Sequence, residues 1–318
     1  MAVNQNATYP QTYRNPTGFQ RWWNRNQLKV IPYFYIAPFF ILFSIFLLYP
    51  IANSFYISFH KQYITGSATF VGLKNYIGLF SDPRFKNSLF NTTVYALGSL
   101  FIQVPIAFLI AYVVNSKLVP SPGAKSLYRM AYFTPLLTST IVASLMFGIL
   151  YDYNSGLINN YLMAWFGEGA KVGWLRDTTI VKLSIIIVLV WRFVGLISLY
   201  FLAGLQNIPK ELEEAAAIDG ANWWIILTRI ILPLLRPVLL FVTVQAINGS
   251  YQIFAEPYML TGGGPSDKSL SIVQYFYQTG FSSGNLGYAA AIAYTLVLII
   301  VTLAVLNLRV FGAFSEDK

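Results

Sequence analysis

The 318-residue sequence contains no cysteine and a single histidine, His60. The absence of cysteine excludes disulfides, thiol nucleophiles, zinc thiolate sites and iron–sulfur clusters. One histidine argues against a histidine metal cluster or a Ser-His-Asp triad, and its place just after the first apolar run predicts an exposed or interfacial side chain. The sequence also has no GxxxxGK[ST] phosphate-binding loop. We therefore expect no enzyme, no metal and no cofactor site in this chain.

Charge is also scarce, since only 10% of the residues are charged, against about 25% in soluble domains. Apolar residues make up 56% and aromatic residues 17% of the chain. A soluble fold with so little charge could not cover its surface, so the composition predicts an integral membrane protein. The net charge of +9 is better explained by cationic loops beside anionic lipid than by nucleic acid, which we do not expect as a partner.

Six apolar stretches are long enough to cross a bilayer as helices, which takes about 20 residues each. They are continuous rather than alternating, which excludes the strands of a membrane β-barrel. The sequence thus predicts an all-α, polytopic membrane protein with six transmembrane helices. The stretches are 31–59, 89–114, 128–151, 180–205, 237–260 and 286–308.

About 30 mostly polar residues precede the first apolar stretch, which does not fit a cleavable signal peptide. Trp22 and Trp23 in this leader are expected at headgroup depth. Twelve basic residues fall in segments on the side of the N-terminus and eight on the other side, which places both termini in the cytoplasm. We expect a cytoplasmic segment 1–30, a transmembrane domain 31–310 and a cytoplasmic tail 311–318.

The segment between the fourth and fifth stretches, about 206–236, lies in a predicted cytoplasmic loop but has the pattern of two short helices. Pro209 can start the first helix, and Glu211 lies near its beginning, where the helix dipole favours anions. Gly220 interrupts the pattern, and a second apolar helix is expected from Trp223 to Leu235. Two readings fit these residues: a knob that contacts another protein, or an amphipathic linker on the bilayer.

A spaced motif in this loop supports the first reading. Residues 214–216 read Glu-Ala-Ala, three residues later comes Gly220, and nine residues after that the chain reads Ile-Ile-Leu-Pro at 230–233. This resembles the cytoplasmic coupling loop of ABC-importer permeases from binding-protein-dependent transport systems. Segments 70–96, 203–209, 258–281 and 287–293 resemble the carbohydrate branch of that family, nearest to its maltose and glycerol-3-phosphate type. The resemblance covers roughly residues 30 to 310.

The resemblance implies the partners and the mechanism. A helix at about 211–222 would dock on one of two separate ATPase subunits, which bind ATP and Mg²⁺ in place of this chain. A second, homologous permease subunit would complete the path, and an external solute-binding protein would deliver the substrate at a prokaryotic inner membrane. The residues implied in coupling are Glu213, Glu214, Ala215, Ala216, Asp219 and Gly220.

Two ionisable residues inside the predicted spans are candidates for the substrate site, because such residues are costly in a membrane and usually functional. Arg192 lies near the middle of the fourth span, and Glu256 lies late in the fifth. Arg192 could instead pair with a carboxylate or a backbone carbonyl. Glu256 could instead lie at an interface or a gate.

The resemblance also suggests which positions would contact a sugar. Several of these positions are apolar here, so the sugar-contact pattern of the maltose permeases is not preserved. Those positions are Leu136, Thr140, Leu189, Arg192, Phe193, Leu196, Ala246 and Ser250. Asn248, Tyr251 and Gln252 are polar neighbours that could substitute, because sugar hydroxyls need hydrogen-bonding groups and aromatic faces. The resulting candidate substrate-binding residues are Thr140, Trp191, Arg192, Leu196, Asn248, Ser250, Tyr251, Gln252 and Glu256.

We therefore expect a permease subunit that translocates an oligosaccharide or related carbohydrate. Because an arginine can bind a carboxylate or phosphate bidentately, an acidic sugar or a glycerol phosphate is the alternative substrate. A secondary transporter is a remote alternative, since it predicts inverted repeats or several intramembrane acids, and the spans hold Glu256 alone. An intramembrane enzyme is disfavoured because it needs a nucleophile with a base, or a metal cluster.

Overall fold

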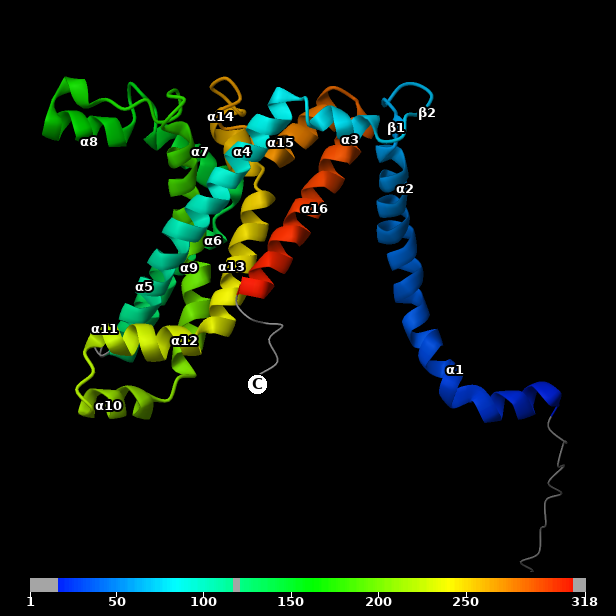
Figure 1. Cartoon of the computed structure of the whole chain (residues 1–318), viewed down its shortest axis with the longest axis horizontal. Coiled ribbons are helices and arrows are strands. Elements are labelled where there is room, and N and C mark those ends of the chain that lie inside the picture. The colour runs from blue at the N-terminus through cyan, green and yellow to red at the C-terminus, as the bar shows by residue number, and fades with distance from the viewer. Residues whose placement is uncertain (1–16, 117–120, 311–318) are drawn as a thin grey trace, which may run out of the picture. The chain divides into compact units, whose positions relative to one another are not determined.

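The computed structural model describes residues 17–116 and 121–310. Residues 1–16 and the whole expected tail, 311–318, lie outside the described residues, so the predicted N-terminal segment is described only from Thr17 on. The chain divides into two compact units, residues 1–54 and 55–318. The described parts are almost entirely helical (Figure 1).

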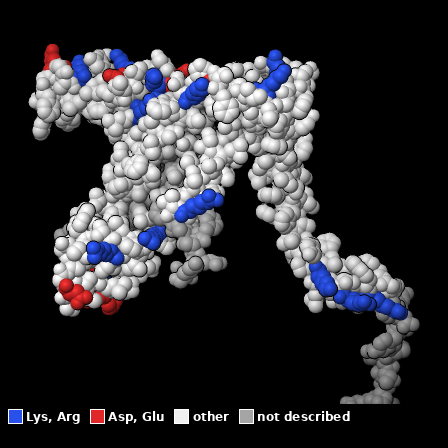
Figure 2. Space-filling model, in the orientation of Figure 1, with Lys and Arg blue, Asp and Glu red and all other residues white. Residues whose placement is uncertain are grey.

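In the first unit, α1 (Gly18–Phe43) runs into the π-helix η1 (Ser44–Leu48) and on into α2 (Tyr49–Ser58), whose last four residues belong to the second unit. The helix begins well before residue 31, where the first apolar stretch was expected to start. Basic side chains gather along the start of α1 (Figure 2). The most apolar 18-residue window of this candidate span, Arg25–Ser58, contains no buried residue. These exposed apolar side chains need a bilayer or another protein around them.

Three further helical stretches in the second unit are long and apolar enough to cross a membrane. The first joins α4 (Pro83–Gly98), the π-helix η2 (Ser99–Gln103) and α5 (Val104–Asn115). The others are α9 (Val181–Gln206) and α16 (Leu286–Val310). Together with the first unit this makes four candidate spans among the described residues, or six if each of two bent helix pairs counts as one.

The first bent pair replaces the continuous helix expected over 128–151. Helix α6 (Pro122–Leu137) and helix α7 (Thr140–Leu150) meet at an angle of 96°. Pro135 lies in the last turn of α6 and lacks the N–H that would continue the helical ladder, which favours an end at this point. The α6 backbone also lies directly against α9 at Gly195. A Cβ added to this glycine would lie 1.9 Å from the backbone carbonyl oxygen of Tyr132.

The second bent pair shortens the helix expected over 237–260. A first segment consists of α11 (Trp223–Ile226), η4 (Leu227–Ile231) and α12 (Leu232–Leu234), and it meets α13 (Arg236–Tyr251) at 72°. The apolar run continues past Tyr251, but the chain leaves the helix there and forms the separate helix α14 (Ala255–Thr261). Ser271 Oγ satisfies the freed Ile253 carbonyl at 2.7 Å.

Short elements gather at the two ends of the second unit (Figure 1). One end holds α3 (Lys74–Leu79), α8 (Leu157–Phe166), the 3₁₀ turn η3 (Glu168–Ala170), α14, α15 (Ile272–Tyr277) and the π-helix η5 (Gln278–Ser282). Strands β1 (His60–Lys61) and β2 (Thr69–Phe70) pair there antiparallel, with His60 opposite Phe70. His60 is buried rather than exposed or interfacial, because its ring packs against those of Tyr56 and Phe70. Its Nδ1 lies 2.8 Å from the Tyr56 carbonyl oxygen. The opposite end holds α10 (Lys210–Ile218) and α11.

Two apolar clusters hold the helices of the second unit together. One joins α5, α9, η4 and α13 around Phe201 and Ile231, which are fully buried. The other joins α4, α13, α15 and α16 around Leu270 and Ile292. Because α9 and α13 are packed from their outer sides, the polar residues on their facing sides are held in fixed positions.

Asp82 links three elements at the end that carries α15. It caps α4 by accepting hydrogen bonds from the backbone N–H groups of Arg84 and Phe85, at 2.9 and 3.3 Å. Its other oxygen accepts from the hydroxyls of Tyr275 at 2.5 Å and Tyr288 at 2.9 Å. Partial burial acts to raise the pKa of the Asp82 carboxyl, but these four hydrogen bonds outweigh it and hold the pKa below its usual 3.8.

Candidate functional site

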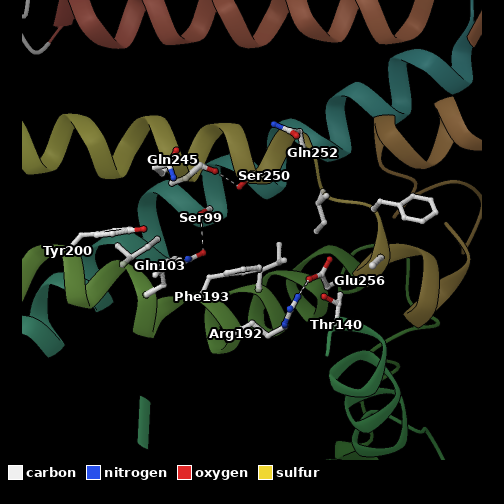
Figure 3. Close-up of a pocket in the computed structure, with 18 residues that line it drawn as sticks. Ser99, Gln103, Thr140, Arg192, Phe193, Tyr200, Gln245, Ser250, Gln252 and Glu256 are labelled. Carbon is white, nitrogen blue, oxygen red and sulfur yellow. Dashed lines mark hydrogen bonds and ion pairs between the residues drawn. The ribbon is translucent and has the colours of Figure 1, made fainter. Parts of the chain in front are cut away.

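A cavity of about 460 Å³ lies between α9, α13, η2 and the start of α14 (Figure 3). Its wall is mostly apolar, with polar groups spaced around it, which is the usual composition of a small-molecule site. The lining residues are Ser99, Gln103, Thr140, Leu189, Arg192, Phe193, Leu196, Ile197, Tyr200, Gln245, Ala246, Gly249, Ser250, Gln252, Ile253, Phe254, Ala255 and Glu256.

The contribution of α9 follows directly from helical geometry. Six of its residues reach the cavity at positions 189, 192, 193, 196, 197 and 200. Spacings of three and four place all of them on one face of the helix. The opposite face of α9 carries buried apolar residues such as Phe201 and Leu202, which pack in the core. The helix is therefore held on one side by apolar packing while its other side lines the cavity.

The π-helix η2 supplies the pair Ser99 and Gln103. Both side chains are buried, and Ser99 Oγ donates to Gln103 Oε1 at 3.0 Å. This bond uses the carbonyl oxygen of the Gln103 amide and fixes the side chain, and it leaves the amide nitrogen as a donor at the cavity wall. π-Helical turns inside α-helices are frequent at functional sites. The pair provides oriented hydrogen-bonding capacity in an otherwise apolar part of the wall.

Arg192 and Glu256 form a buried ion pair at one end of the cavity (Figure 3). Their side chains are only 7% and 6% exposed. The Arg192 guanidinium also lies 4.8 Å from the centre of the Phe193 ring. Arg192 Nε is buried without a hydrogen-bond partner in the described part of the chain. The pair brings two opposite charges to the wall and leaves it with no net charge from these two residues.

The structure brings together six of the nine candidate substrate-binding residues: Thr140, Arg192, Leu196, Ser250, Gln252 and Glu256 all line the cavity. Leu189, Phe193 and Ala246 line it as well, while Leu136 does not.

The other three candidates lie outside the lining, each next to it in the sequence. Trp191 packs its ring 5.2 Å from that of Phe147. The Tyr251 hydroxyl lies 3.0 Å from Thr93 Oγ1, and the ring belongs to the core that joins α4 and α13. Asn248 accepts a hydrogen bond from Gln252 Nε2 at 2.5 Å, so it contacts a lining residue without lining the cavity itself. These three residues support the wall.

Sequence reasoning missed four polar lining residues. Tyr200 continues the α9 stripe by one further turn beyond Leu196, so the helical period could have found it. Ser99 and Gln103 are polar residues inside a long apolar run, and their spacing of four was the available signal. Gln245 lies one turn before Gly249 on α13 and had the same signal.

The loop that carries the sequence motif forms a helical hairpin at the opposite end of the unit from α14. Helix α10 has Glu211 and Glu213 in its first turn, where the helix dipole favours carboxylates. The helix ends at Ile218, and Gly220, two residues further on, has a left-handed φ of +82°. The Ala221 N–H donates to the Ala216 carbonyl at 2.9 Å, and the Gly220 N–H donates to the Ala217 carbonyl at 3.1 Å. This is a Schellman motif, which favours glycine at this position.

The second arm of the hairpin is fixed to the bundle. Asn222 Oδ1 accepts from the Ile225 N–H at 2.9 Å and caps α11. Trp223 Nε1 donates to the Tyr112 hydroxyl at 2.7 Å, which ties α11 to the end of α5. Leu227 and Ile231 are buried in the core with α5 and α9. A force applied to the hairpin therefore reaches the long helices through packed side chains.

Helix α10 itself contributes no buried residue. Of the six residues implied in coupling, Glu214, Ala215, Asp219 and Gly220 are exposed and Glu213 and Ala216 are half-buried. An exposed apolar residue, Ile218, lies on the same short helix with 87% of its surface accessible. A helix with small, acidic and apolar side chains all exposed has the features of a contact surface. Within the described residues, no group of three His, Asp or Glu residues could hold a metal ion.

Comparison with known proteins identifies the class of protein that this architecture belongs to. Residues 74–310 match the family described as binding-protein-dependent transport system inner membrane component, and the chain belongs to that family. It is 37% identical to the arabinooligosaccharides transport system permease protein AraP of Bacillus subtilis, over 91% of both chains. It is 33% identical to the lactose transport system permease protein LacF of Rhizobium radiobacter, over 93% of this chain and 99% of that protein.

A solved structure has the same fold. It is the crystal structure of a bacterial ABC transporter involved in the import of the acidic polysaccharide alginate, with a TM-score of 0.79. The match covers 93% of this chain and 100% of the other at 22% sequence identity. At this level of identity the likeness concerns the fold.

Proposed function

We propose that this chain is a membrane subunit of an ATP-driven importer that translocates a neutral sugar, delivered by an external solute-binding protein. Family membership and relatives named for arabinooligosaccharide and lactose transport support the importer class and the sugar. The observation that carries the proposal is the exposed hairpin of α10 and α11, in which the Glu-Ala-Ala and Gly motif forms a projecting surface.

In this proposal each bent helix pair crosses the membrane as one span, which gives six spans. The hairpin of α10 and α11 lies at the cytoplasmic end, and α14, α15 and α8 lie at the external end. The C-terminal end of α16 lies at the same end of the second unit as α10 (Figure 1). This arrangement agrees with the excess of basic residues predicted for the cytoplasmic side, and we assign the C-terminus to that side as well. The N-terminus is assigned to the cytoplasm by the same excess.

Helix α10 docks on one of two separate ATPase subunits, which bind ATP and Mg²⁺. Glu214 is exposed on the docking surface, and Gly220 sets the angle between α10 and the arm that is tied to the bundle. Closure of the ATPases moves the hairpin, and the packed core carries this motion to α5 and α9. The cavity then changes its access as two rigid bodies reorient, and a second homologous subunit completes the path.

The cavity favours a neutral sugar over an acidic one because, among the described residues that line it, the one cation is already paired. The charge of Arg192 is balanced by that of Glu256 in the ion pair. A substrate carboxylate near Arg192 would therefore also lie near the like charge of Glu256. The remaining polar lining groups are neutral amides and hydroxyls from Ser99, Gln103, Thr140, Tyr200, Gln245, Ser250 and Gln252. Such groups hydrogen-bond to sugar hydroxyls, while Phe193 and Phe254 offer aromatic faces. Trp191, Asn248 and Tyr251 hold this wall in place.

Transport by the complete importer in proteoliposomes tests the proposal. We expect the cognate binding protein to bind a neutral oligosaccharide and to drive its ATP-dependent uptake. A uronic-acid oligosaccharide of the same length should be taken up at least ten times more slowly. Equal or faster uptake of the acidic sugar contradicts the neutral-sugar assignment, and uptake without ATP contradicts the importer class.

A further inference from the structure

Helix α8 presents a row of large apolar side chains on one face. Leu157, Tyr161 and Trp165 are spaced four residues apart, so they lie along a single stripe. Their exposed fractions are 54%, 67% and 80%, which is unusual for residues of this size. Phe166 follows with 74% of its surface exposed.

The opposite face of α8 carries Asn159, which bonds to the chain segment that follows the helix. Asn159 is buried, accepts hydrogen bonds from the Val172 N–H and Trp174 Nε1 at 3.1 Å each, and donates to the Val172 carbonyl at 3.0 Å. Asn159 is two positions from both Leu157 and Tyr161, which corresponds to a rotation of about 200° around the helix. The apolar stripe therefore points away from the segment around residues 172–174.

The segment around residues 172–174 determines which way the stripe faces. In Figure 1 the chain after α8 returns on the side of the helix that faces away from the long helices of the bundle. The stripe thus faces the side along which α7 and α9 run. Helix α8 projects beyond the bundle at the level where those helices end (Figure 1).

Helix α8 and the segment after it, residues 157–177, form an arm. Contacts at its base tie the arm to α7 and α9, so the direction of the stripe is fixed. The rings of Tyr151 and Trp174 stack with centroids 5.4 Å apart. Ser184 Oγ, near the start of α9, donates to the Trp174 carbonyl at 2.7 Å, and the Tyr151 hydroxyl donates to the Ser184 carbonyl at 3.2 Å. These contacts join the end of α7, the segment after α8 and the start of α9.

The charged residues of the arm lie on the side opposite the apolar stripe. The sequence of α8, LINNYLMAWF, contains no charged residue. The segment that follows it carries Glu168, Lys171, Arg176 and Asp177, and both basic groups lie over the Tyr153 ring at 5.6 and 5.3 Å. Figure 2 shows charged side chains on the face of the arm turned away from the bundle helices and none on the visible part of the opposite face.

We propose that α8 is an interfacial helix that inserts Leu157, Tyr161 and Trp165 into the lipid leaflet at this end of the bundle. The occupant we assign is lipid because the stripe is uncharged, rich in aromatic residues and continuous in level with the ends of the membrane-spanning helices. Tyrosine and tryptophan are the residues preferred at headgroup depth, and an interfacial helix buries its apolar face there while its polar side faces water. The charged segment above α8 then faces the aqueous phase. The proposal needs only a surrounding bilayer and does not depend on the substrate.

The absence of cysteine makes a direct test possible. A nitroxide label is attached to Tyr161→Cys, and the complete importer is assembled with partner subunits free of reactive cysteine in phosphatidylethanolamine–phosphatidylglycerol nanodiscs. Collision of the label with oxygen, which enters lipid, is compared with collision with a water-soluble nickel chelate. Glu168→Cys in the charged segment is the matched control.

We expect the ratio of oxygen to nickel accessibility at position 161 to exceed that at position 168 by at least fivefold. Equal nickel accessibility at the two positions overturns the proposal, because the stripe then faces water. Protection of position 161 from both reagents also overturns it, because a partner protein then covers the stripe. The same measurement at Trp165→Cys keeps the test intact if the first variant does not fold.

Discussion

Arg192 on α9 and Glu256 on α14 are joined by an ion pair that is buried on both sides and spans 64 positions of sequence. It connects the wall of the cavity to the short helix that follows the bend at residues 252–254. Both charges are removed from solvent, so each depends on the other as its partner. The Arg192 guanidinium also packs over the Phe193 ring. The cavity's charge balance and the position of α14 thus depend on the same two residues.

The first prediction concerns the stability of this pair. Arg192→Gln or Glu256→Gln alone leaves one buried charge without a partner and should destabilise the chain by about 3–5 kcal/mol. The double variant Arg192→Met with Glu256→Leu removes both charges and should recover most of that loss. Thermal unfolding of the purified membrane protein measures the effect. Single variants as stable as the parent would show that the pair does not form.

A second prediction tests the cavity through Gln103. Gln103→Leu keeps the size of the side chain and removes a hydrogen bond to a bound sugar, worth about 1–1.5 kcal/mol, so the KM for uptake should rise about tenfold. Gln274→Leu is the matched control, since Gln274 is also a buried amide but lies on α15, away from the cavity. The cavity assignment fails if the two variants change KM equally.

The third prediction concerns the backbone at Gly220. A Cβ at this position would meet no atom within 4 Å, so any effect of substitution comes from the φ of +82°. Asparagine tolerates this conformation, whereas valine should cost about 1–2 kcal/mol and move α10. Uptake should therefore decrease in the order glycine, asparagine, valine. Equal uptake by the asparagine and valine variants would contradict a role for the turn.

Asp82 gives a prediction about pH. Its pKa is held below 3.8 in the folded chain, so its ionised form contributes stability above about pH 4 that is lost as pH falls through the folded pKa. Asp82→Asn keeps the helix cap but weakens the bonds from Tyr275 and Tyr288, and should lower stability at pH 7 by about 1–2 kcal/mol. The difference between the two proteins should shrink at pH 3. A pH-independent difference would contradict the role of the charge.

Much of this arrangement could be read from residue patterns, because helical period and membrane thickness leave few solutions. The resemblance implied Leu189, Arg192, Phe193 and Leu196, whose spacing of three and four puts them on one helical face, and the structure places all four on the cavity wall. The turn at Gly220 was also expected, and its positive φ gives the physical reason.

Other features depend on packing between distant segments and are not readable locally. The bend between α6 and α7 lies inside the single span predicted over 128–151, and both helices are apolar on average, so hydropathy alone does not mark the break. The partner of Arg192 was left open between a carboxylate, a carbonyl and a substrate, because only the fold brings α14 next to α9. Tyr251 looked like a cavity residue by its polarity, but its hydroxyl faces Thr93 on α4.

A fifth prediction concerns the docking surface. Glu214→Lys reverses the charge of an exposed α10 residue and should reduce uptake at least tenfold while leaving the amount of inserted protein unchanged. Glu168→Lys makes the same change on an exposed glutamate at the opposite end of the unit and should leave uptake near the parental level. A loss shared by both variants would point to a general effect of charge.

The most direct test of the account is a cysteine crosslink between α10 and the ATPase. The chain has no cysteine, so Ala217→Cys places a single thiol on the exposed surface of α10, and Glu168→Cys places one on the charged segment after α8 as a control. In the assembled importer, a short photoactivatable thiol reagent at position 217 should crosslink to the ATPase subunit, and the same reagent at 168 should not. Absence of an ATPase crosslink from position 217 in an importer that hydrolyses ATP and transports sugar would contradict the central claim.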